Sequence, residues 1–413
     1  MCALPVTAPG ARRSRRRPWH VLMYVQHLSG IGHQHRSARI ARALTARGLR
    51  VTYVSGGMPL PDLDTGASER VQLMPVRARD QRYQELLDAS GQPVTPAWKA
   101  ARREQLLAVV EQSQADAVVL ETFPFGRKLL RFELRPLVRR IAARRPRPPL
   151  LLSSVRDIIE PRSDVRNYAP MADWLERYFD RVLVHSDPAL FDFADTFPLY
   201  ERIRDKVLYT GYISEAGTEA PASPALRPDP RYQEAVIVSA GGGATGEDLL
   251  RTALEARALT RLRERRWLLL AGPHFPDPAY AELKARAGAG VEVQRNQSNF
   301  REILAACQVS VSQAGYNTML DLLSTGTRTV LAPFARFNER EQIVRARHLA
   351  SLGLATVVYA EDLNARTLAA AIDQAAARPP GPSLPLDTAG ADYSARLIEA
   401  LLNGSAVPAR SGS

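Results

Sequence analysis

Apolar residues in the first half of the chain fall into short, nearly uninterrupted runs, and an amphipathic segment follows most of them. The runs occupy residues 20–25 (HVLMYV), 51–57 (VTYVSGG), 115–120 (ADAVVL), 150–153 (LLLS) and 181–185 (RVLVH). Segment 37–48 (SARIARALTARG) has apolar residues at helical spacing and stops at a glycine. Because continuous apolar strands are typical of sheets covered by helices on both faces, we predict a parallel βαβ sheet.

The same alternation of apolar runs and amphipathic segments starts again near residue 235. Its runs are 235–239 (AVIVS), 267–272 (WLLLAG), 291–294 (VEVQ), 309–312 (VSVS), 329–333 (TVLAP) and 355–359 (ATVVY). The chain has 413 residues, and single cores rarely grow beyond about 250–300 residues. We therefore predict an α/β protein with two Rossmann-like domains that face each other across a cleft.

Shifts in composition predict the domain boundaries. We expect a disordered basic tail over 1–19, a first domain over 20–213, an Ala/Pro/Glu-rich linker over 214–233, a second domain over 234–380, and a C-terminal helix and tail over 381–413. The final helix, over 392–402, follows a proline-rich span. We expect this helix to cross back and pack on the first domain.

Charge is distributed unevenly along the chain. The net charge is +12, yet five arginines lie within residues 12–17, and nine basic residues lie within 127–147 beside the single acid Glu133. The remainder is close to neutral, so we expect no nucleic-acid partner. No apolar run approaches the roughly 20 residues that span a bilayer, the N-terminus lacks the apolar core of a secretory signal, and no Cys/His cluster has metal-ligand spacing. These features predict a cytoplasmic protein without a metal site.

One turn in the second half has the features of an anion site. Residues 313–318 (QAGYNT) lie between an apolar strand and a helix, and the unpaired N–H groups at the start of such a helix bind phosphate. Asp321 lies one turn after Thr318 on the same helix face, where it is placed to accept hydrogen bonds from a ribose. Glu341 and Gln342 follow the next strand, at the same edge of the sheet. This set predicts a nucleotide site.

A glycine-rich loop opens the second domain. Gly241, Gly242 and Gly243 follow a strand and precede a helix, so the backbone is able to approach a ligand closely. The loop fits G-x-G-x-x-G in form but lacks the acidic residue of the dinucleotide fingerprint, and no P-loop motif occurs. The loop alone is therefore a weak signal, which gains weight from the nucleotide site predicted at the same sheet edge.

The first domain opens on a second glycine-rich loop, which carries a histidine. Gly30, Gly32 and His33 follow the first strand, and His33 starts the next helix. Proximity to the helix N-terminus favours a neutral imidazole that can accept a proton, so we predict that His33 is a general base. His27 and His35 are expected to have structural roles instead.

Taken together, Gly-x-Gly-His-x-x-Arg at 30–36, the triple glycine and Gln-Ala-Gly-Tyr-Asn-Thr…Asp…Glu-Gln resemble the GT-B glycosyltransferases. Within them, the set is most similar to family 28, that of the peptidoglycan N-acetylglucosaminyltransferase and its uncharacterised relatives. The resemblance covers about residues 20–375. It implies a metal-independent inverting hexosyltransferase that takes a uridine diphosphate sugar as substrate, needs no cofactor and uses a hydroxyl acceptor, which in the family is lipid-linked.

The resemblance also implies roles for individual residues. The backbone of Gln297 would face the base, Asp321 would bind the ribose, and Glu341 and Gln342 would bind sugar hydroxyls. His33 would deprotonate the acceptor. Gly315, Tyr316, Asn317 and Thr318 would hold the diphosphate. The other residues of the implied donor site are Gly32, Gly241, Gly242, Gly243 and Gln313.

The chain departs from the family pattern at several positions. The family has Glu at the ribose position, where this chain has Asp321, and Gln where it has Glu341. The family also has an Arg and a Ser near Gln313 and Ala314. Its second glycine loop, which contacts the lipid acceptor, is replaced here by 121–127 (ETFPFGR). The sequence therefore leaves the acceptor and the sugar undetermined.

Segment 121–127 suggests a surface for the acceptor or for a membrane. Glu121, Phe123 and Phe125 lie beside a predicted helix on which Arg127, Arg131, Arg135 and Arg139 recur every four residues as one cationic stripe. Apolar residues beside clustered arginine suit an anionic membrane surface, so we predict weak, salt-sensitive binding to anionic vesicles and peripheral contact with the inner face of a membrane. A solvated basic helix face is the alternative.

The same residues leave three other functions open. A nucleotide-sugar hydrolase would use His33 to activate water, and a nucleotide-sugar epimerase would share the fold. A non-enzymatic binding module would use the arginine-rich tail, which lacks the interleaved aromatic residues of single-strand binders.

Overall fold

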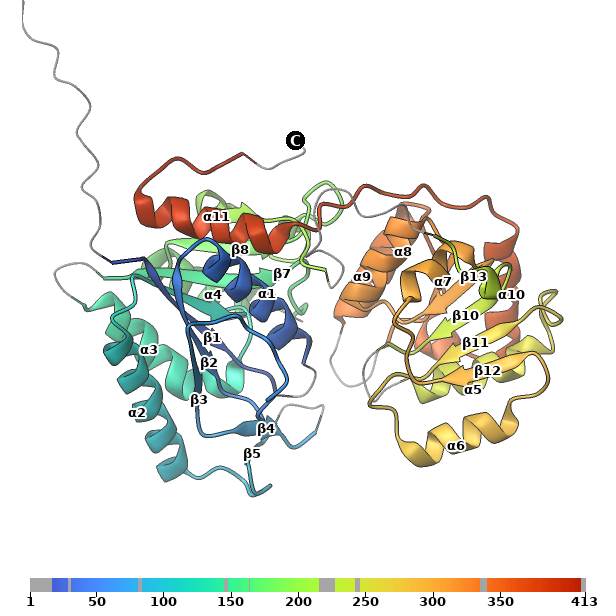
Figure 1. The fold of residues 1–413 in the computed structure, drawn as a ribbon, viewed down its shortest axis with the longest axis horizontal. Helices are drawn as coiled ribbons and strands as arrows, with labels where there is room; N and C mark the ends of the chain where they lie inside the picture. Colours follow the sequence, from blue (N-terminus) through green and yellow to red (C-terminus); the bar gives the residue numbers. More distant parts are fainter. Residues whose placement is uncertain are drawn as a thin grey trace, which may run out of the picture.

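The computed structural model describes residues 17–28, 31–80, 84–144, 148–162, 164–214, 227–241, 246–334 and 340–409. Figure 1 shows two α/β domains side by side, each with helices on both faces of a central sheet. All pairings within the two large sheets are parallel, as the continuous apolar runs predicted.

The first domain is built on a sheet whose strands lie in the order β3-β2-β1-β6-β7-β8-β9. Their bounds are Glu69–Gln72 (β3), Arg50–Ser55 (β2), His20–Val25 (β1), Ala117–Glu121 (β6), Leu150–Arg156 (β7), Arg181–His185 (β8) and Val207–Tyr209 (β9); a separate hairpin pairs Val76–Ala78 (β4) with Leu86–Asp88 (β5). Strand β1 is buried along its whole length because β2 and β6 flank it and helices cover both faces.

Helices from both ends of the described chain cover this sheet. They are α1 (Gly32–Ala46), α2 (Pro96–Ser113), α3 (Arg131–Ala142), α4 (Ala169–Tyr178) and α11 (Gly390–Asn403). Leu22 and Tyr24 of β1 face a core shared with α2, α3 and α4. Val21 and Met23 face a core shared with α1 and α11. Alternate residues of one strand thus serve two cores, which is why the run is apolar throughout.

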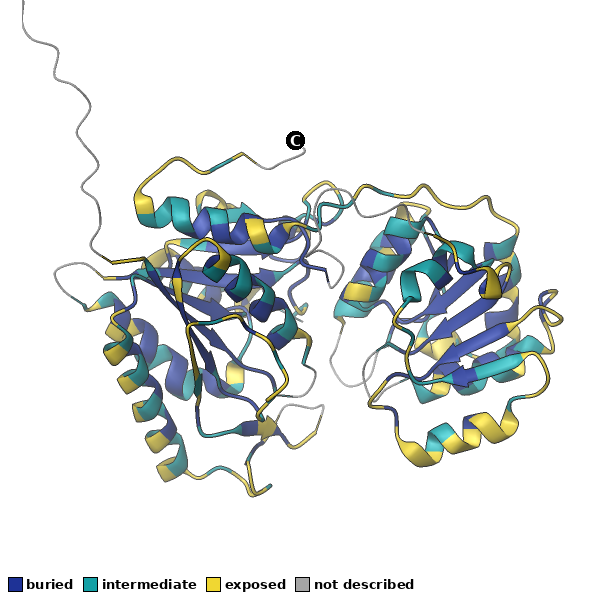
Figure 2. Ribbon diagram, in the orientation of Figure 1, coloured by how far each residue is buried: buried dark blue, intermediate teal, exposed yellow. Residues whose placement is uncertain are grey.

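The second domain repeats this plan with a sheet in the order β12-β11-β10-β13-β14-β15. The strands are Val291–Gln294 (β12), Trp267–Leu270 (β11), Val236–Ser239 (β10), Val309–Ser312 (β13), Thr329–Leu331 (β14) and Thr356–Val357 (β15). The helices are Glu247–Arg257 (α5), Asp277–Arg286 (α6), Phe300–Ala306 (α7), Tyr316–Thr325 (α8), Glu341–Ser351 (α9) and Ala365–Ala376 (α10). Figure 2 shows the buried strands between helices whose outer faces are exposed.

The chain returns to the first domain through α11, as the sequence led us to expect. This helix packs along α1, and its Leu397 and Ile398 are fully buried in the α1 core. Just before it, Tyr212 N–H donates to the Asp387 carbonyl at 2.7 Å. A Cβ on Gly390 would lie 2.5 Å from the Gly211 carbonyl oxygen, so this close approach of two backbones requires glycine.

The segment around Phe123 and Phe125 does not form the apolar surface that we predicted for a membrane or an acceptor. Both side chains are buried, Phe123 against Trp174 and Phe179, and Phe125 against Phe193 and Phe197. The alternating phenylalanines fill the first-domain core, because the loop after β6 turns inward over α4 and the turns that follow β8.

The basic repeat also differs from the prediction at its first member. Arg127 precedes α3, has a left-handed backbone and turns toward Glu121. Arg135 and Arg139 do lie on α3, where both guanidinium groups approach the Trp174 ring. Within the described ranges, no helix is long and apolar enough to span a membrane. Vesicle binding by α3 therefore stays a prediction that rests on its arginines alone.

Candidate active site

His33 lies in the first turn of α1, at the carboxyl edge of the first sheet. Its Nδ1 lies 2.5 Å from Oε1 of Glu121, the last residue of β6. Because β6 pairs directly with β1, the strand that leads into α1, the sheet brings together two residues that are 88 positions apart. Glu121 is therefore a partner of the histidine, which corrects its predicted place on an acceptor or membrane surface.

Glu121 is the centre of a buried charge cluster. Its side chain is 1% exposed, and its Oε1 also accepts from Arg36 Nη2 at 2.6 Å and from Thr122 Oγ1 at 2.5 Å. Its Oε2 pairs with Arg127. Although burial raises the pKa of Glu121, the charges of Arg127, His33 and Arg36 outweigh burial and hold this pKa well below its usual range. Glu121 is thus a carboxylate at neutral pH.

The same surroundings keep His33 neutral. Burial is the largest effect and lowers the pKa of His33 to about 4, against the opposing charge of Glu121. A neutral imidazole beside a carboxylate donates its Nδ1–H to that carboxylate, so the Nε2 lone pair is left to accept a proton. The pair therefore has the arrangement of a general base with a fixed tautomer.

In the second domain, α8 begins at the turn that the sequence singled out. Gly315 is its N-cap, and within the described chain no side chain caps this helix. Asn317 is exposed in the first turn, and Thr318 is partly exposed beside it. Asp321 lies one turn further on, 23% exposed and 4.0 Å from Nε of Arg301. An uncapped helix start with partly exposed polar side chains is suited to an anion.

Tyr316 differs from the prediction that placed it at the diphosphate. Its side chain is buried, and its hydroxyl accepts from Ile213 N–H at 3.1 Å and donates to the His185 carbonyl at 3.1 Å. Both partners belong to the first domain, so the side chain of Tyr316 joins the domains, and only its backbone N–H is left for a ligand.

The glycine loop of the second domain adjoins this helix start. Gln313 is buried, and a Cβ on Gly246 would lie 3.1 Å from its Nε2 and 2.5 Å from the Ala240 Cβ. Gly241 and Gly246 both have positive φ, which glycine adopts without strain. Gly242 and Gly243 lie outside the described residues. Gln297 follows β12, where its side chain donates to Gln294.

Gln342 fixes the loop that leads into α8. Its Oε1 accepts from Ala314 N–H at 3.1 Å and from Phe334 N–H at 3.0 Å. The amide oxygen thus bridges the ends of β13 and β14, and the Nε2 group of the same side chain remains a donor. The residue lies at the sheet edge where the sequence predicted it.

Glu341, predicted to bind sugar hydroxyls, is occupied by two arginines. Its Oε2 accepts from Arg156 Nη2 at 2.7 Å and its Oε1 from Arg345 Nη2 at 2.7 Å. Burial raises the pKa of Glu341, but these two positive charges outweigh burial and lower the pKa to about 2. Glu341 is therefore an ion-pair residue, which corrects the simple picture of a sugar ligand.

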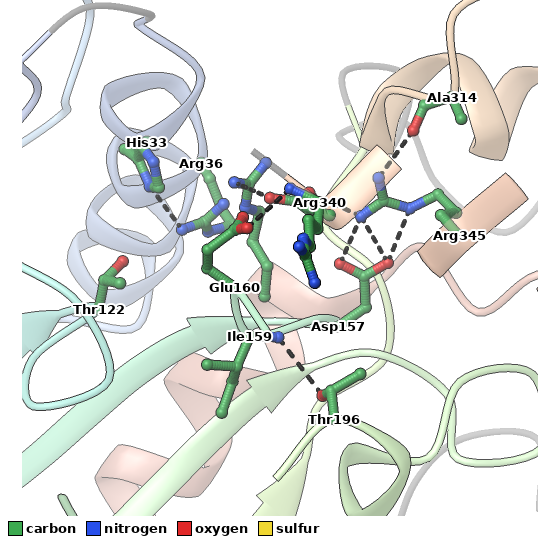
Figure 3. Close-up of polar contacts among 12 residues, drawn as sticks. His33, Arg36, Thr122, Asp157, Ile159, Glu160, Thr196, Ala314, Arg340 and Arg345 are labelled. Carbon is green, nitrogen blue, oxygen red and sulfur yellow. Dashed lines mark hydrogen bonds and ion pairs between the residues drawn. The ribbon is translucent and has the colours of Figure 1, made fainter. Parts of the chain in front are cut away.

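Arg345 holds the two domains together. Its side chain and that of Asp157, which follows β7, are both 0% exposed, and three hydrogen bonds of 3.0–3.2 Å join them. Arg345 also donates to the Ala314 carbonyl at 2.8 Å. Figure 3 shows this clamp beside His33 and Arg36, with Glu160 between them accepting from Arg340 N–H at 2.7 Å.

Sequence reasoning missed Glu121 as a partner of His33, and it missed Arg156, Asp157 and Arg345 altogether. Glu121 and Arg156 share one signal: each is a charged residue that ends an apolar strand, where α/β sheets bind ligands. Arg345 gave no comparable signal, because it is one of several charged residues on α9. Among the described residues, no group of three or more His, Cys, Asp or Glu is placed to hold a metal ion.

Two parallel α/β domains, joined by a crossed-back final helix, with polar residues from both domains between them, define the GT-B fold. The glycotransferase of kitacinnamycin superposes with a TM-score of 0.59 and 19% identity, over 94% of this chain and 97% of that one. MurG of Acinetobacter baumannii gives a TM-score of 0.57 at 15% identity, over 92% and 99%. At these identities the similarity is one of fold.

Sequence comparison adds a family for the second domain. Residues 236–384 match the glycosyltransferase family 28 C-terminal domain, which confirms the resemblance seen in the motifs. The chain is 31% identical over 137 residues to the UDP-N-acetylglucosamine–N-acetylmuramyl-(pentapeptide) pyrophosphoryl-undecaprenol N-acetylglucosamine transferase of Geobacillus kaustophilus, over 33% of this chain and 37% of that protein. An uncharacterized glycosyltransferase of Methanopyrus kandleri is 27% identical over 233 residues, or 55% of this chain and 63% of that protein. The chain thus aligns with less than two thirds of either relative.

Proposed function

We propose that this protein transfers a hexosyl group from a nucleoside diphosphate sugar to a hydroxyl group of an acceptor, with inversion at the anomeric carbon. The observation that carries the proposal is the pairing of His33 with Glu121 in the first domain, whose His185 carbonyl accepts directly from Tyr316 at the uncapped start of α8 in the second. A base on one side and an anion site on the other are the two parts that such a transfer needs. The family 28 match over the second domain supports the same activity.

The donor is proposed to be a uridine diphosphate sugar held by the second domain. Its relatives support this choice: the Geobacillus kaustophilus transferase is named for UDP-N-acetylglucosamine, and the structural neighbour LpCGTa was solved in complex with UDP. In this chain, the N–H groups at 315–318 and the side chains of Asn317 and Thr318 would hold the diphosphate, and Asp321 would hold the ribose. The backbone of Gln297 would face the base, and Nε2 of Gln342 would donate to a sugar hydroxyl.

In the proposed reaction, Nε2 of His33 accepts the proton of the acceptor hydroxyl while the acceptor oxygen attacks the anomeric carbon. The bond between that carbon and the β-phosphate oxygen breaks, and its electron pair leaves with the nucleoside diphosphate. Glu121 stabilises the imidazolium that forms, because its carboxylate lies 2.5 Å from Nδ1. No cofactor and no metal ion take part in this proposal.

The acceptor is proposed to bind on the first-domain side of His33. The same domain contains a cavity of about 290 Å³, and its lining includes Tyr53, Ser55, Leu60, Pro61, Arg70 and Val71. Tyr53 donates to Gln34 Oε1 at 2.8 Å, which ties the cavity wall to the residue next to His33. The lining combines apolar residues with the polar side chains of Ser55 and Arg70, which suits an acceptor that has an apolar body and a hydroxyl group.

The test has two stages. A thermal-shift screen with UDP, TDP, GDP, ADP and their sugars comes first, since a ligand at 100 times its Kd stabilises the folded state by about 2.7 kcal/mol. Release of nucleoside diphosphate is then measured with and without hydroxyl acceptors. Release that needs an acceptor supports the transferase, and equal release in water alone identifies a hydrolase. The absence of any nucleotide effect would contradict both activities.

Replacement of the base gives the first specific prediction. His33→Ala should lower turnover by roughly 10²–10⁴-fold, because one positioned general base contributes that much. The affinity for UDP should barely change, since His33 lies in the other domain. Isothermal titration with UDP and steady-state turnover together check both parts; near-normal turnover would remove His33 from the mechanism.

A further inference from the structure

Arg156 ends β7 in the first domain and reaches across to the second domain. We propose that Arg156 is a further catalytic residue, the cation that binds the β-phosphate of the leaving nucleoside diphosphate, and that Glu341 positions it. The inference rests on the proposed function and extends it, because it assigns the leaving group to a residue outside the family 28 domain.

The contacts of Glu341 bring Arg156 to the anion site. Arg156 Nη2 lies 2.7 Å from Glu341 Oε2, and the neighbouring Gln342 accepts from Ala314 N–H at 3.1 Å. Ala314 directly precedes Gly315, the N-cap of α8. Glu341 and Gln342 thus connect the guanidinium of Arg156 in the first domain to the helix start that is proposed to hold the diphosphate.

Exposure distinguishes the two arginines that share Glu341. The side chain of Arg345 is 0% exposed, and its donors are directed to Asp157, Ala314 and Glu341. The side chain of Arg156 is 27% exposed, so this arginine is partly accessible from solvent. An Arg fork has five N–H donors, and a phosphate oxygen can accept from those that Glu341 does not use. Arg156 is therefore the member of the pair that can reach a ligand.

Arg156 also lies within electrostatic range of the proposed base. Burial is the main cause of the low pKa of His33, and the charges of Arg127 and Arg156 act in the same direction. A cation that is near both His33 and the start of α8 is near the bond between sugar and phosphate. When the sugar is transferred, negative charge develops on the phosphate oxygen of this bond.

The charge balance of the cluster favours an anionic ligand. Among the residues that the structure describes, four guanidinium groups (Arg36, Arg127, Arg156 and Arg345) face three carboxylates (Glu121, Asp157 and Glu341) in the ion pairs of the site. The nearby Glu160 and Arg340 cancel each other in this count. One positive charge is left over. In the transfer, the β-phosphate oxygen keeps the electron pair of the broken bond and gains one negative charge, which a positioned cation stabilises.

The experiment compares two variants that remove the same ion pair, Arg156→Gln and Glu341→Gln, with Arg156→Lys as the conservative variant. Affinities of the full chain for UDP and for uridine are measured by isothermal titration, and melting temperatures are recorded. We expect Arg156→Gln to weaken UDP binding by about tenfold or more while uridine binding is unchanged, as the loss of a charge-assisted hydrogen bond predicts. Arg156→Lys should retain part of the preference for UDP.

The matched variant separates a phosphate contact from a structural one. Glu341→Gln should lower the ratio of UDP to uridine affinity less than Arg156→Gln does, because Arg156 loses its positioning partner but keeps its charge. A merely structural role predicts the opposite order, since Glu341→Gln also deprives the buried Arg345 of a partner. An unchanged ratio in Arg156→Gln, or equal losses in both variants, would overturn the inference and leave the transferase proposal standing. Failure of the wild-type chain to bind any nucleoside diphosphate would overturn both.

Discussion

At His33, burial and the charge of Glu121 act on the pKa in opposite directions, and burial has the larger effect. Glu121 cannot raise this pKa to its usual value because three other donors, on Arg36, Thr122 and Arg127, share the same carboxylate. His33 is therefore neutral across the physiological pH range, and the carboxylate of Glu121 lies at its Nδ1. Such a base differs from an exposed histidine, which is half protonated near pH 6.5.

A pH profile should show this difference. The base works only while Nε2 is unprotonated, so activity falls as pH drops through the pKa of His33 in the folded chain, which burial lowers to about 4. We expect kcat/KM to stay level from pH 8 down to about pH 5.5 and to fall only below it. Circular dichroism at each pH controls for unfolding. An acid limb centred near 6.5 would contradict the lowered pKa of this half-buried histidine.

The sequence identified candidate site residues where they lie within a recognisable local motif. The glycine loop before His33 and the turn at 313–318 could both be found by eye, because strand, turn and helix are contiguous there. Glu121 and Arg156 acquire their roles from partners 88 and 185 positions away. Pairings over such distances depend on strand order in the sheets, which no local pattern contains.

At the scale of elements, the apolar runs located the long strands because their two faces serve two cores. The short strands β3, β4, β5 and β9 were missed, since β3 is largely exposed and the other three have three residues each. The loop after β6 was interpreted as a surface. Its two phenylalanines point inward, and spacing alone does not distinguish an apolar loop that covers a core from one that faces a membrane.

Helix α8 carries a prediction of its own, because Asp321 lies one turn beyond the proposed phosphate site. Asp321→Ala should weaken UDP binding by about tenfold, the effect of losing a charged hydrogen-bond acceptor. It should also abolish any preference of the wild-type chain for UDP over 2′-deoxy-UDP. Titration calorimetry with both nucleotides measures this preference.

Arg301→Gln is the matched control for Asp321. It removes the cation 4.0 Å from Asp321 but leaves the carboxylate in place, so the preference for the ribose hydroxyl should persist. If Asp321→Ala changes turnover alone and leaves both affinities intact, Asp321 does not hold the ribose.

At the scale of the whole molecule, the domains are joined by polar contacts as well as by chain connections. Arg345 with Asp157, Tyr316 with Ile213 and His185, and Arg340 with Glu160 all cross from one domain to the other. An apolar cluster that includes Tyr212 and Met319 lies behind them. The site is thus assembled by residues that also fix the relative position of the domains.

The Arg345 clamp should be essential for stability. Arg345→Met leaves Asp157 buried without its partner, and breaking such a pair costs about 3–5 kcal/mol. We expect a clearly lower melting temperature and earlier urea unfolding. Adding Asp157→Leu to the variant should recover part of the loss, since an apolar pair replaces the uncompensated charge.

An exposed ion pair supplies the comparison. Arg204 and Glu201 are 62% and 77% exposed, so Arg204→Met should change the free energy of unfolding by no more than about 1 kcal/mol. Equal effects of Arg204→Met and Arg345→Met would show that the buried clamp contributes no more than a surface pair.

The return of α11 to the first domain has a consequence for biosynthesis. Helix α1 ends at Ala46, but the helix that covers its apolar face ends at Asn403. At 5–20 residues per second, a ribosome needs roughly 20–70 s to make the stretch between them. During that interval the second domain can fold as a unit, while the nascent first domain still presents an uncovered apolar face to chaperones. The domain that is translated first is therefore the one that is completed last.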